Sequence, residues 1–111
     1  MGGEQMNEFL LVLTTVSSED EGRAIAQKIV EDRLAACVSE LSAVRSFYWW
    51  EDRMNDEQEF ILIIKTRTSL FKEVEEKIKT LHSYEVPEII ALPVLAGSED
   101  YLEWIRQSTK S

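Results

Sequence analysis

Residues 9–13 read Phe-Leu-Leu-Val-Leu, and residues 60–64 read Phe-Ile-Leu-Ile-Ile. Neither run alternates between apolar and polar side chains, so each predicts a β-strand that is buried on both faces. A helical pattern follows each run, and a further strand pattern follows each helix. The chain therefore reads as a strand-helix-strand unit that occurs twice, and this repetition decides the fold.

Three helices are predicted from their capping residues and apolar stripes. Ser18 and Glu21 form a capping box, and the acidic residues 19–21 suit the positive end of the first helix dipole. Thr68-Ser69 is expected to cap a second helix, and Ser98-Glu99-Asp100 a short last helix that runs through residues 104–106. The apolar stripes of the first two helices are Gly22, Ile25, Ala26, Ile29 and Val30, and then Phe71, Val74, Ile78 and Leu81.

Two further segments supply the remaining strands. One begins at Ala35–Val38 and continues to Trp49-Trp50, and because its faces do not alternate cleanly we expect a β-bulge within it. A polar turn is expected at Glu51–Asp56. The other strand spans Glu88–Leu95, and Pro93, which has no N–H for a ladder bond, places it at a sheet edge or at a bend.

The element order is β-α-β-β-α-β with a short C-terminal helix, which predicts an α+β, ferredoxin-like sandwich. In that topology the first and third strands are central, and these are the two strands with continuous apolar sequence. Residues 9–111 are expected to form a single domain, because their length is near the commonest domain size. Residues 1–8 are expected to be a flexible tail.

Two helices can cover only one face of such a sheet. Exposed apolar patches as large as the second face are uncommon on monomers. We therefore expect a homo-oligomer, in which another copy of the chain covers that face. The apolar residues of the two central strands alternate between two faces, and one of these faces has no helix to pack on. The first set is Leu10, Val12, Ile61 and Ile63, and the second set is Phe9, Leu11, Leu13, Phe60, Leu62 and Ile64.

The composition argues against several classes of partner. The chain has 21 acidic and 12 basic residues and a formal net charge of -9, which disfavours nucleic-acid binding and favours attraction of cations, although a soluble acidic surface alone explains the same balance. No apolar run approaches the about 20 residues that span a bilayer. The N-terminus lacks the basic and apolar regions of a signal peptide, and Cys37 is a single cysteine, so we expect a cytoplasmic location.

Five segments in register resemble the CutA divalent-cation tolerance proteins. The resemblance covers residues 9–106. It implies a ferredoxin-like protomer, a stable homotrimer whose neighbouring protomers pair strands edge to edge, and a role in tolerance of copper and other divalent metals. The segments are Arg-Leu-Ala-Ala-Cys-Val at 33–38, Phe-Tyr-Trp-Trp-Glu at 47–51, Glu59 to Thr66, His-Ser-Tyr-Glu-Val-Pro-Glu-Ile-Ile at 82–90, and Tyr-Leu-Glu-Trp-Ile at 101–105.

The chain departs from the family pattern in two places. His82-Ser83-Tyr84 replaces the usual His-Pro-Tyr, which loosens the turn but keeps the histidine. Leu13 stands where some metal-linked members have a cysteine near the end of the first strand. Without that thiolate, a harder site of nitrogen and oxygen ligands, suited to Cu(II), is favoured over a Cu(I) site.

His82 and Glu88 are the candidate metal ligands. A neutral imidazole binds copper, zinc or nickel through one ring nitrogen, and a carboxylate supplies oxygen. The alternative for His82 is a loop histidine that hydrogen-bonds a backbone carbonyl and orders the turn. The alternative for Glu88, and the favoured one for Glu85, is an ion pair with a neighbouring basic residue.

Two other groups of residues are candidates for binding. Lys65 and Arg67, with Tyr84 and Glu85, are the candidates for a small-ligand cleft between subunits, in which the two basic residues would hold an anion. Aromatic residues are enriched at interface hot spots, so subunit packing is expected for Tyr48, Trp49 and Trp50. Cys37, flanked by apolar residues, is expected to be buried rather than reactive.

Two functional hypotheses follow. The first is a cytoplasmic homotrimer that contributes to divalent metal tolerance by weak binding of Cu(II) or another divalent metal. The second is a regulatory or interaction scaffold that binds small anionic ligands at subunit clefts, by analogy of fold alone. No enzymatic activity is expected, because the sequence has no phosphate-binding loop, no metalloprotease motif and no nucleophile paired with a base.

Overall fold

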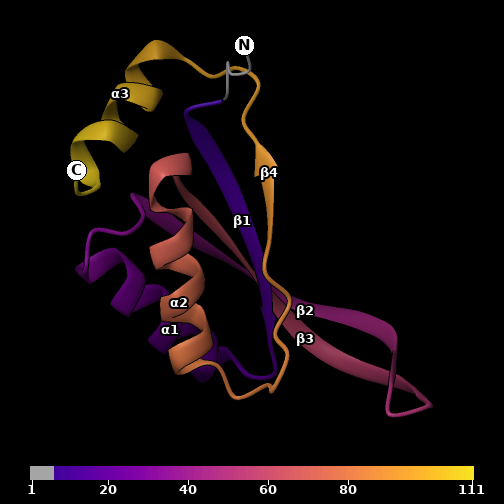
Figure 1. Cartoon of the computed structure of the whole chain (residues 1–111). Helices are drawn as coiled ribbons and strands as arrows, with labels where there is room; N and C mark the ends of the chain where they lie inside the picture. Colours follow the sequence, from indigo (N-terminus) through magenta and orange to yellow (C-terminus); the bar gives the residue numbers. More distant parts are fainter. Residues whose placement is uncertain (1–6) are drawn as a thin grey trace.

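The computed structural model describes residues 7–111, and residues 1–6 of the predicted tail lie outside the described part of the chain. The described residues form an α+β fold with a four-stranded antiparallel sheet and a layer of helices (Figure 1). The strands are β1 (Phe9–Val16), β2 (Cys37–Trp50), β3 (Arg53–Arg67) and β4 (Ile90–Pro93), and the helices are α1 (Glu19–Glu31), α2 (Phe71–Leu81) and α3 (Glu99–Ser108). This order confirms the predicted sequence of elements.

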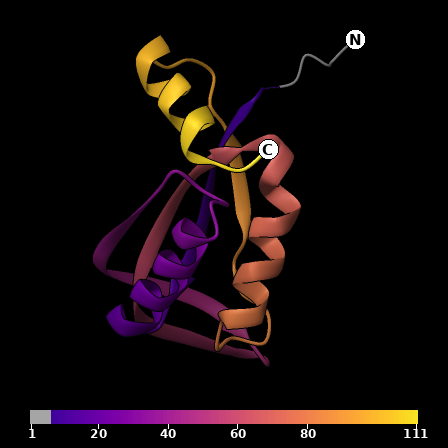
Figure 2. The ribbon, with the colours of Figure 1, turned by 90° about the vertical axis from the view of Figure 1, so that its left-hand side faces the viewer.

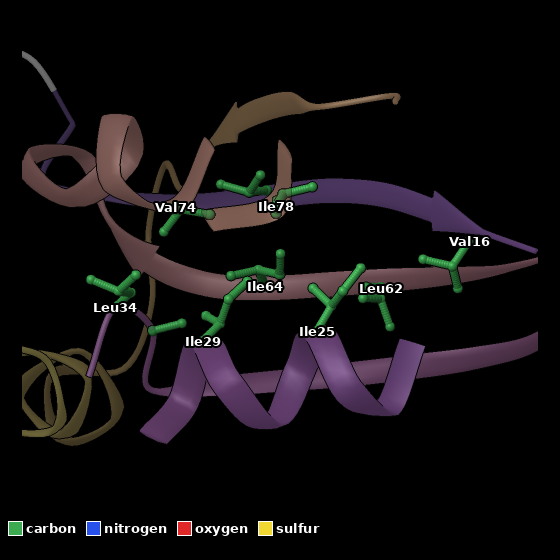
Figure 3. Packing of buried hydrophobic residues seen from close by; sticks show 10 residues of the cluster. Val16, Ile25, Ile29, Leu34, Leu62, Ile64, Val74 and Ile78 are labelled. Carbon is green, nitrogen blue, oxygen red and sulfur yellow. The ribbon is translucent and has the colours of Figure 1, made fainter. Parts of the chain in front are cut away.

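The sheet order is β2-β3-β1-β4, so β1 and β3 are central, as their continuous apolar sequence predicted. Helices α1 and α2 lie side by side over one face of the sheet (Figure 2). The Ser18 hydroxyl accepts the Glu21 N–H at 3.1 Å, which confirms the predicted cap of α1. The core between the layers includes Val12, Val16, Leu62 and Ile64 of the sheet and Ile25, Ile29, Val74 and Ile78 of the helices (Figure 3).

The other face of the sheet is apolar and much of it is accessible. The antiparallel register places Leu13 opposite Ile63 on one side and Ile90 on the other, so side chains of three strands meet there. We call this surface the open face. Its apolar members on β1, β3 and β4 are Leu11, Leu13, Ile61, Ile63, Ile90 and Leu92.

One detail of the predicted alternation was wrong. Leu10 and Val12 were grouped with Ile61 and Ile63, but the register places them on the helix side of the sheet. Leu11 and Leu13 instead share the open face with those two isoleucines. The register between two strands depends on their tertiary pairing, which the periodicity within each strand does not fix.

Strands β2 and β3 form a long hairpin that extends beyond the layer of helices (Figure 1). The register of the pair shifts between Leu41 and Val44, and Ala43 there has a positive φ of 56°. This irregularity is the predicted β-bulge. It shifts the alternation of β2 by one residue, so that Val44, Ser46, Tyr48 and Trp50 follow Leu41 on the open face.

The turn of the hairpin is shorter than the sequence predicted. Glu51 and Asp52 make the turn, with φ of 52° and 62°, and β3 begins at Arg53. The expected turn over Glu51–Asp56 was therefore wrong in its second part, because residues 53–56 pair with residues 47–50. Three of these four strand residues, Arg53, Asn55 and Asp56, are polar, and the end of the hairpin is mostly exposed.

The start of α2 also differs from the prediction. A 3₁₀ turn at Thr68–Leu70 precedes α2, and Leu70 at its N-cap provides no side-chain hydrogen bond. The expected cap by Thr68-Ser69 was therefore wrong. The Thr68 hydroxyl instead donates to the Asn7 carbonyl at 2.6 Å and ties the segment before β1 to the end of β3.

The C-terminal part of the chain closes one end of the sheet. Strand β4 is shorter than the predicted Glu88–Leu95 and lies at the edge beside β1, where Pro93 costs no ladder bond on its free side. Ser98 caps α3 as predicted, and Ile105 of this helix packs on Phe9 and Ala36. No helix within residues 7–111 has the length and apolar character needed to cross a membrane.

Candidate functional site

A cleft of about 550 Å³ lies where the open face meets the hairpin and the loop that follows α2. One wall comes from residues 46–50 at the end of β2, the floor from the end of β1 and the middle of β3, and the other wall from the loop. The lining residues are Thr15, Ser46, Phe47, Tyr48, Trp50, Glu59, Tyr84, Glu85, Val86 and Glu88. The predicted candidates Tyr48, Trp50, Tyr84, Glu85 and Glu88 are therefore brought together.

His82 orders the loop wall of this cleft. Its side chain is 0% exposed. The Nδ1 atom accepts the Tyr84 N–H at 3.0 Å, and Nε2 lies 2.7 Å from the Thr15 carbonyl oxygen. Because an amide can only donate and a carbonyl can only accept, this arrangement requires the tautomer with the proton on Nε2.

Both ring nitrogens of His82 are thus engaged with the backbone. This geometry fits the alternative role predicted for His82, in which the histidine hydrogen-bonds a backbone carbonyl and orders the turn. Metal binding through Nδ1 would require the Tyr84 N–H to leave, and binding through Nε2 would require loss of the bond to Thr15. The role of His82 as a metal ligand stays a prediction.

Glu21 at the start of α1 anchors the same loop. Its Oε2 accepts the Ser83 N–H at 2.7 Å and lies 3.4 Å from Nδ1 of His82. Burial alone would raise the pKa of the Glu21 carboxyl, but the hydrogen bonds from Ser83 oppose burial, and the pKa is lowered. The loop is therefore fixed to α1 as well as to β1.

Glu59 and Tyr84 form a buried pair at the floor of the cleft. Glu59 is 5% exposed, and its Oε2 accepts the Tyr84 hydroxyl at 2.6 Å. Burial, followed by the hydrogen bond to Glu59, raises the pKa of the Tyr84 hydroxyl well above its ordinary range. The hydroxyl therefore remains a proton donor, and the second carboxylate oxygen of Glu59 has no hydrogen-bond partner among residues 7–111.

Glu88 places a second carboxyl on the cleft. Burial, and then the charge of Glu59, raise the pKa of this carboxyl. The Tyr48 hydroxyl on the opposite wall also has a raised pKa, caused by burial and by the carboxylates of Glu57 and Glu59. The cleft is consequently a region of negative potential with no basic side chain in its lining.

Few side chains of this cleft could bind a metal ion. Within residues 7–111, no group of three or more His, Cys, Asp or Glu side chains is arranged to hold a metal. Glu59 and Glu88 lie close enough for one charge to affect the other, and carboxylate oxygens suit divalent cations. One chain thus offers part of a coordination sphere, and water or a neighbouring chain would have to complete it.

Lys65 and Arg67 lie away from this cleft. Lys65 is six positions from Glu59 along β3, which is about 20 Å at the usual rise of a strand. Its Nζ donates to Ser39 Oγ at 3.1 Å and to Cys37 Sγ at 3.5 Å, so the cysteine is half-buried beside a lysine. Arg67 donates to Thr109 Oγ1 at 2.9 Å and to the carbonyl of residue 110. The predicted set of Lys65, Arg67, Tyr84 and Glu85 therefore does not form one site in the described chain.

The aromatic residues predicted for subunit packing line the exposed hairpin. Trp49 is 73% exposed, and Tyr48, Trp50 and the neighbouring Phe47 and Met54 are also exposed. An exposed apolar group of this size is typical of a protein interface. The hairpin and the open face both expose apolar side chains next to the cleft.

Glu59 is the site residue that the sequence reasoning missed. It appeared only as the first residue of a family segment, because an acidic residue before an apolar strand looks like a strand boundary. One signal was available, since Glu59 shares its strand face with Ile61 and Ile63 and was therefore placed for burial. Its partner Tyr84 was predicted, but their separation in the sequence hides the contact.

The sheet order, the single layer of helices and the acidic cleft beside an aromatic hairpin define the class as a ferredoxin-like α+β protein with an acidic cleft. The family model described as CutA1 divalent ion tolerance protein matches residues 10–108. This chain therefore belongs to the CutA1 family.

Similar proteins come from distant organisms. The divalent-cation tolerance protein CutA of Thermus thermophilus is 46% identical over 99 residues, which is 89% of this chain and 96% of that protein. A rice relative named Protein CutA 1, chloroplastic, is 43% identical over 101 residues, and those cover 91% of this chain but 57% of the rice protein. The crystal structure of CutA1 from Oryza sativa has a TM-score of 0.91 at 40% identity and covers 96% of this chain and 98% of that one.

Proposed function

We propose that this chain is a homotrimer that contributes to divalent-cation tolerance by weak binding of divalent metal, Cu(II) included, in the cytoplasm and without catalysis. The observation that carries the proposal is the acidic cleft, in which Glu59 and Glu88 face a common space beside an uncovered apolar sheet face. The family names of its relatives, divalent-cation tolerance proteins, support the metal role.

Self-association is supported by the open face and the hairpin. Leu41, Ile90 and Leu92 are exposed there, and so are the hairpin aromatics. Burial of apolar surface stabilises an assembly by about 25 cal/mol per Å², so a second copy that covers this face would stabilise the oligomer substantially relative to separate chains. Three copies are the number that the resemblance to the family implies.

Light scattering coupled to size-exclusion chromatography tests the oligomeric state. The proposal predicts a mass three times that of the 12.8 kDa chain, unchanged on dilution through the micromolar range. A mass equal to that of one chain would contradict it.

Metal binding is supported by the pair of carboxyls in the cleft. Burial, and then the charge of Glu59, raise the pKa of the Glu88 carboxyl, so a bound cation would relieve part of the cost of its charged form. Water, or groups of a neighbouring protomer, would supply the remaining ligands. His82 contributes by holding the loop, and as a ligand only if its backbone hydrogen bonds are exchanged for a metal bond.

Calorimetric titration with Cu(II) tests this part of the proposal. We expect weak binding in the unmodified protein and at least about tenfold weaker binding in Glu88→Gln, since a charged ligand is lost. Glu31→Gln, at the exposed end of α1, is the matched control and should bind as the unmodified protein does. Equal affinities in all three proteins would remove Glu88 from the site, and unchanged binding in His82→Ala would remove His82 as a ligand.

The second candidate function is a scaffold that binds small anions at subunit clefts. Its strongest support is Lys65, a cationic side chain on the open face beside Ser39. The cleft itself is lined by carboxyls and does not favour an anion. In a thermal-shift screen, stabilisation by anions or nucleotides and by no metal would favour the scaffold over the metal-binding function.

A further inference from the structure

The cleft is larger and more apolar than a bare metal ion requires. Its volume of about 550 Å³ lies within the range of about 300–1,000 Å³ typical of small-molecule sites. Phe47, Tyr48, Trp50, Tyr84 and Val86 form most of its walls. Metal ligands are oxygen, nitrogen and sulfur atoms, so metal binding does not explain these walls. Self-association accounts for the hairpin aromatics among them but not for Tyr84 and Val86 of the loop.

The polar groups of the cleft select the charge of an occupant. The lining includes Glu59, Glu85 and Glu88 but no Lys, Arg or His. Glu59 is the most constrained of the three, because it is 5% exposed and the Tyr84 hydroxyl fixes one of its oxygens. Its other oxygen is available to accept a hydrogen bond, so an anion is disfavoured and a donor with positive charge is favoured.

The combination of both features points to one ligand class. Aromatic faces attract cations, most strongly when the cation is withdrawn from water. A carboxylate at the floor of the cleft balances the positive charge of such a cation. We propose that this cleft binds an organic ammonium ion, with its apolar body against the aromatic walls and its N–H groups directed to Glu59 and Glu88. The inference shares its location with the proposed metal site but does not depend on metal binding.

Three ring compounds of similar size separate the contributions of charge and apolar contact. Benzylamine, protonated at pH 7, benzyl alcohol and benzoate can each be titrated into the full-length protein by ligand-observed NMR. We expect benzylammonium to bind at least about tenfold more tightly than benzyl alcohol, and benzoate more weakly than both. Equal binding of the ammonium and the alcohol would overturn the inference, and so would the absence of ammonium binding.

Substitution of the carboxyls locates the binding. Glu59→Gln keeps an acceptor for the Tyr84 hydroxyl, and Glu88→Gln keeps the size of its side chain, so both variants preserve the walls. Each should weaken benzylammonium binding by about tenfold and leave benzyl alcohol binding unchanged. Glu31→Gln is the control. Unchanged ammonium affinity in Glu88→Gln would overturn the inference even if Glu59→Gln failed to fold.

Copper titrations on the same proteins distinguish this inference from the proposed function. Ammonium binding without copper binding would contradict the metal role and support the inference. Copper binding without ammonium binding would overturn the inference and leave the metal role intact.

Discussion

The His82 imidazole links the loop of residues 82–88 to β1 through both of its nitrogens. His82→Ala removes the bonds to the Thr15 carbonyl and the Tyr84 N–H from a side chain that is 0% exposed. At about 1 kcal/mol for each bond, we expect the free energy of unfolding to fall by at least about 2 kcal/mol in the absence of metal. Urea denaturation followed by circular dichroism measures the loss.

His82→Asn is the control for this experiment, because its side-chain oxygen is placed to accept the Tyr84 N–H as Nδ1 does. This variant should lose less stability than His82→Ala. If His82 served only as a metal ligand, both metal-free variants would be as stable as the unmodified protein, which would contradict the structural role.

Glu88 should make stability depend on pH. Its carboxyl has a pKa above the ordinary 4.5 because of burial and then the charge of Glu59. The protonated form therefore favours the folded state, and this contribution is complete below pH 4.5 and is lost as the pH rises through the raised pKa.

Glu88→Gln removes this penalty. We expect a gain of less than about 1 kcal/mol at neutral pH, since Glu88 is exposed overall, and no difference from the unmodified protein below the ordinary pKa of a glutamate. Thermal melts at pH 4 and pH 7 measure the two values. A variant that is less stable at pH 7 would show that the charged form stabilises the fold.

The candidate residues could be predicted from the sequence only in part. The segment from His82 to Glu88 is dense in polar side chains between a helix and a strand, and it does form a wall of the cleft. The contact between Glu59 and Tyr84 could not be predicted from the sequence, because only the folded sheet brings the loop close to β3. The position of Lys65 relative to this cleft could not be predicted for the same reason, since it depends on the direction of β3, and its role in a cleft between subunits stays a prediction.

The hairpin turn carries local strain. Glu51 and Asp52 both have positive φ, which is the geometry of a turn that prefers Asn-Gly. We expect the double variant Glu51→Asn and Asp52→Gly to stabilise the fold by about 1 kcal/mol, measured by urea denaturation. The same Asn-Gly pair at Gln27 and Lys28, inside α1, should destabilise it, and a loss of stability from the turn variant would contradict the assigned turn.

Elements with continuous apolar sequence or clear caps were predicted well, and polar strands were not. Strands β1 and β3 and the cap of α1 follow from Phe9–Leu13, Phe60–Ile64 and Ser18. Arg53–Asp56 looked like a loop because no apolar alternation accompanies an exposed hairpin. Arg53, Asn55 and Asp56 bury little surface in a single chain and have little reason to be apolar, whereas the aromatic residues of the paired strand are expected to be covered by another copy.

The apolar surface opposite the helices should determine the oligomeric state of the whole molecule. Leu92 on the open face is 46% exposed, and Val30 on α1 is 40% exposed. Leu92→Lys places a charge on the face that we expect to be buried between copies, whereas Val30→Lys changes a helix surface of similar exposure. Light scattering should show dissociation toward a 12.8 kDa chain for Leu92→Lys alone. The same mass for both variants would show that the open face is not the interface.

Paramagnetic line broadening tests most directly whether the cleft attracts cations. Cu(II) broadens the amide signals of residues close to the bound ion, so a titration of the isotope-labelled protein locates the ion without any substitution. We predict that the signals of Glu59, Tyr84 and Glu88 broaden first and that excess benzylammonium restores them. Earliest broadening at the acidic start of α3, at Glu99 and Asp100, with the cleft signals unchanged, would contradict the assignment of the cleft as the cation site.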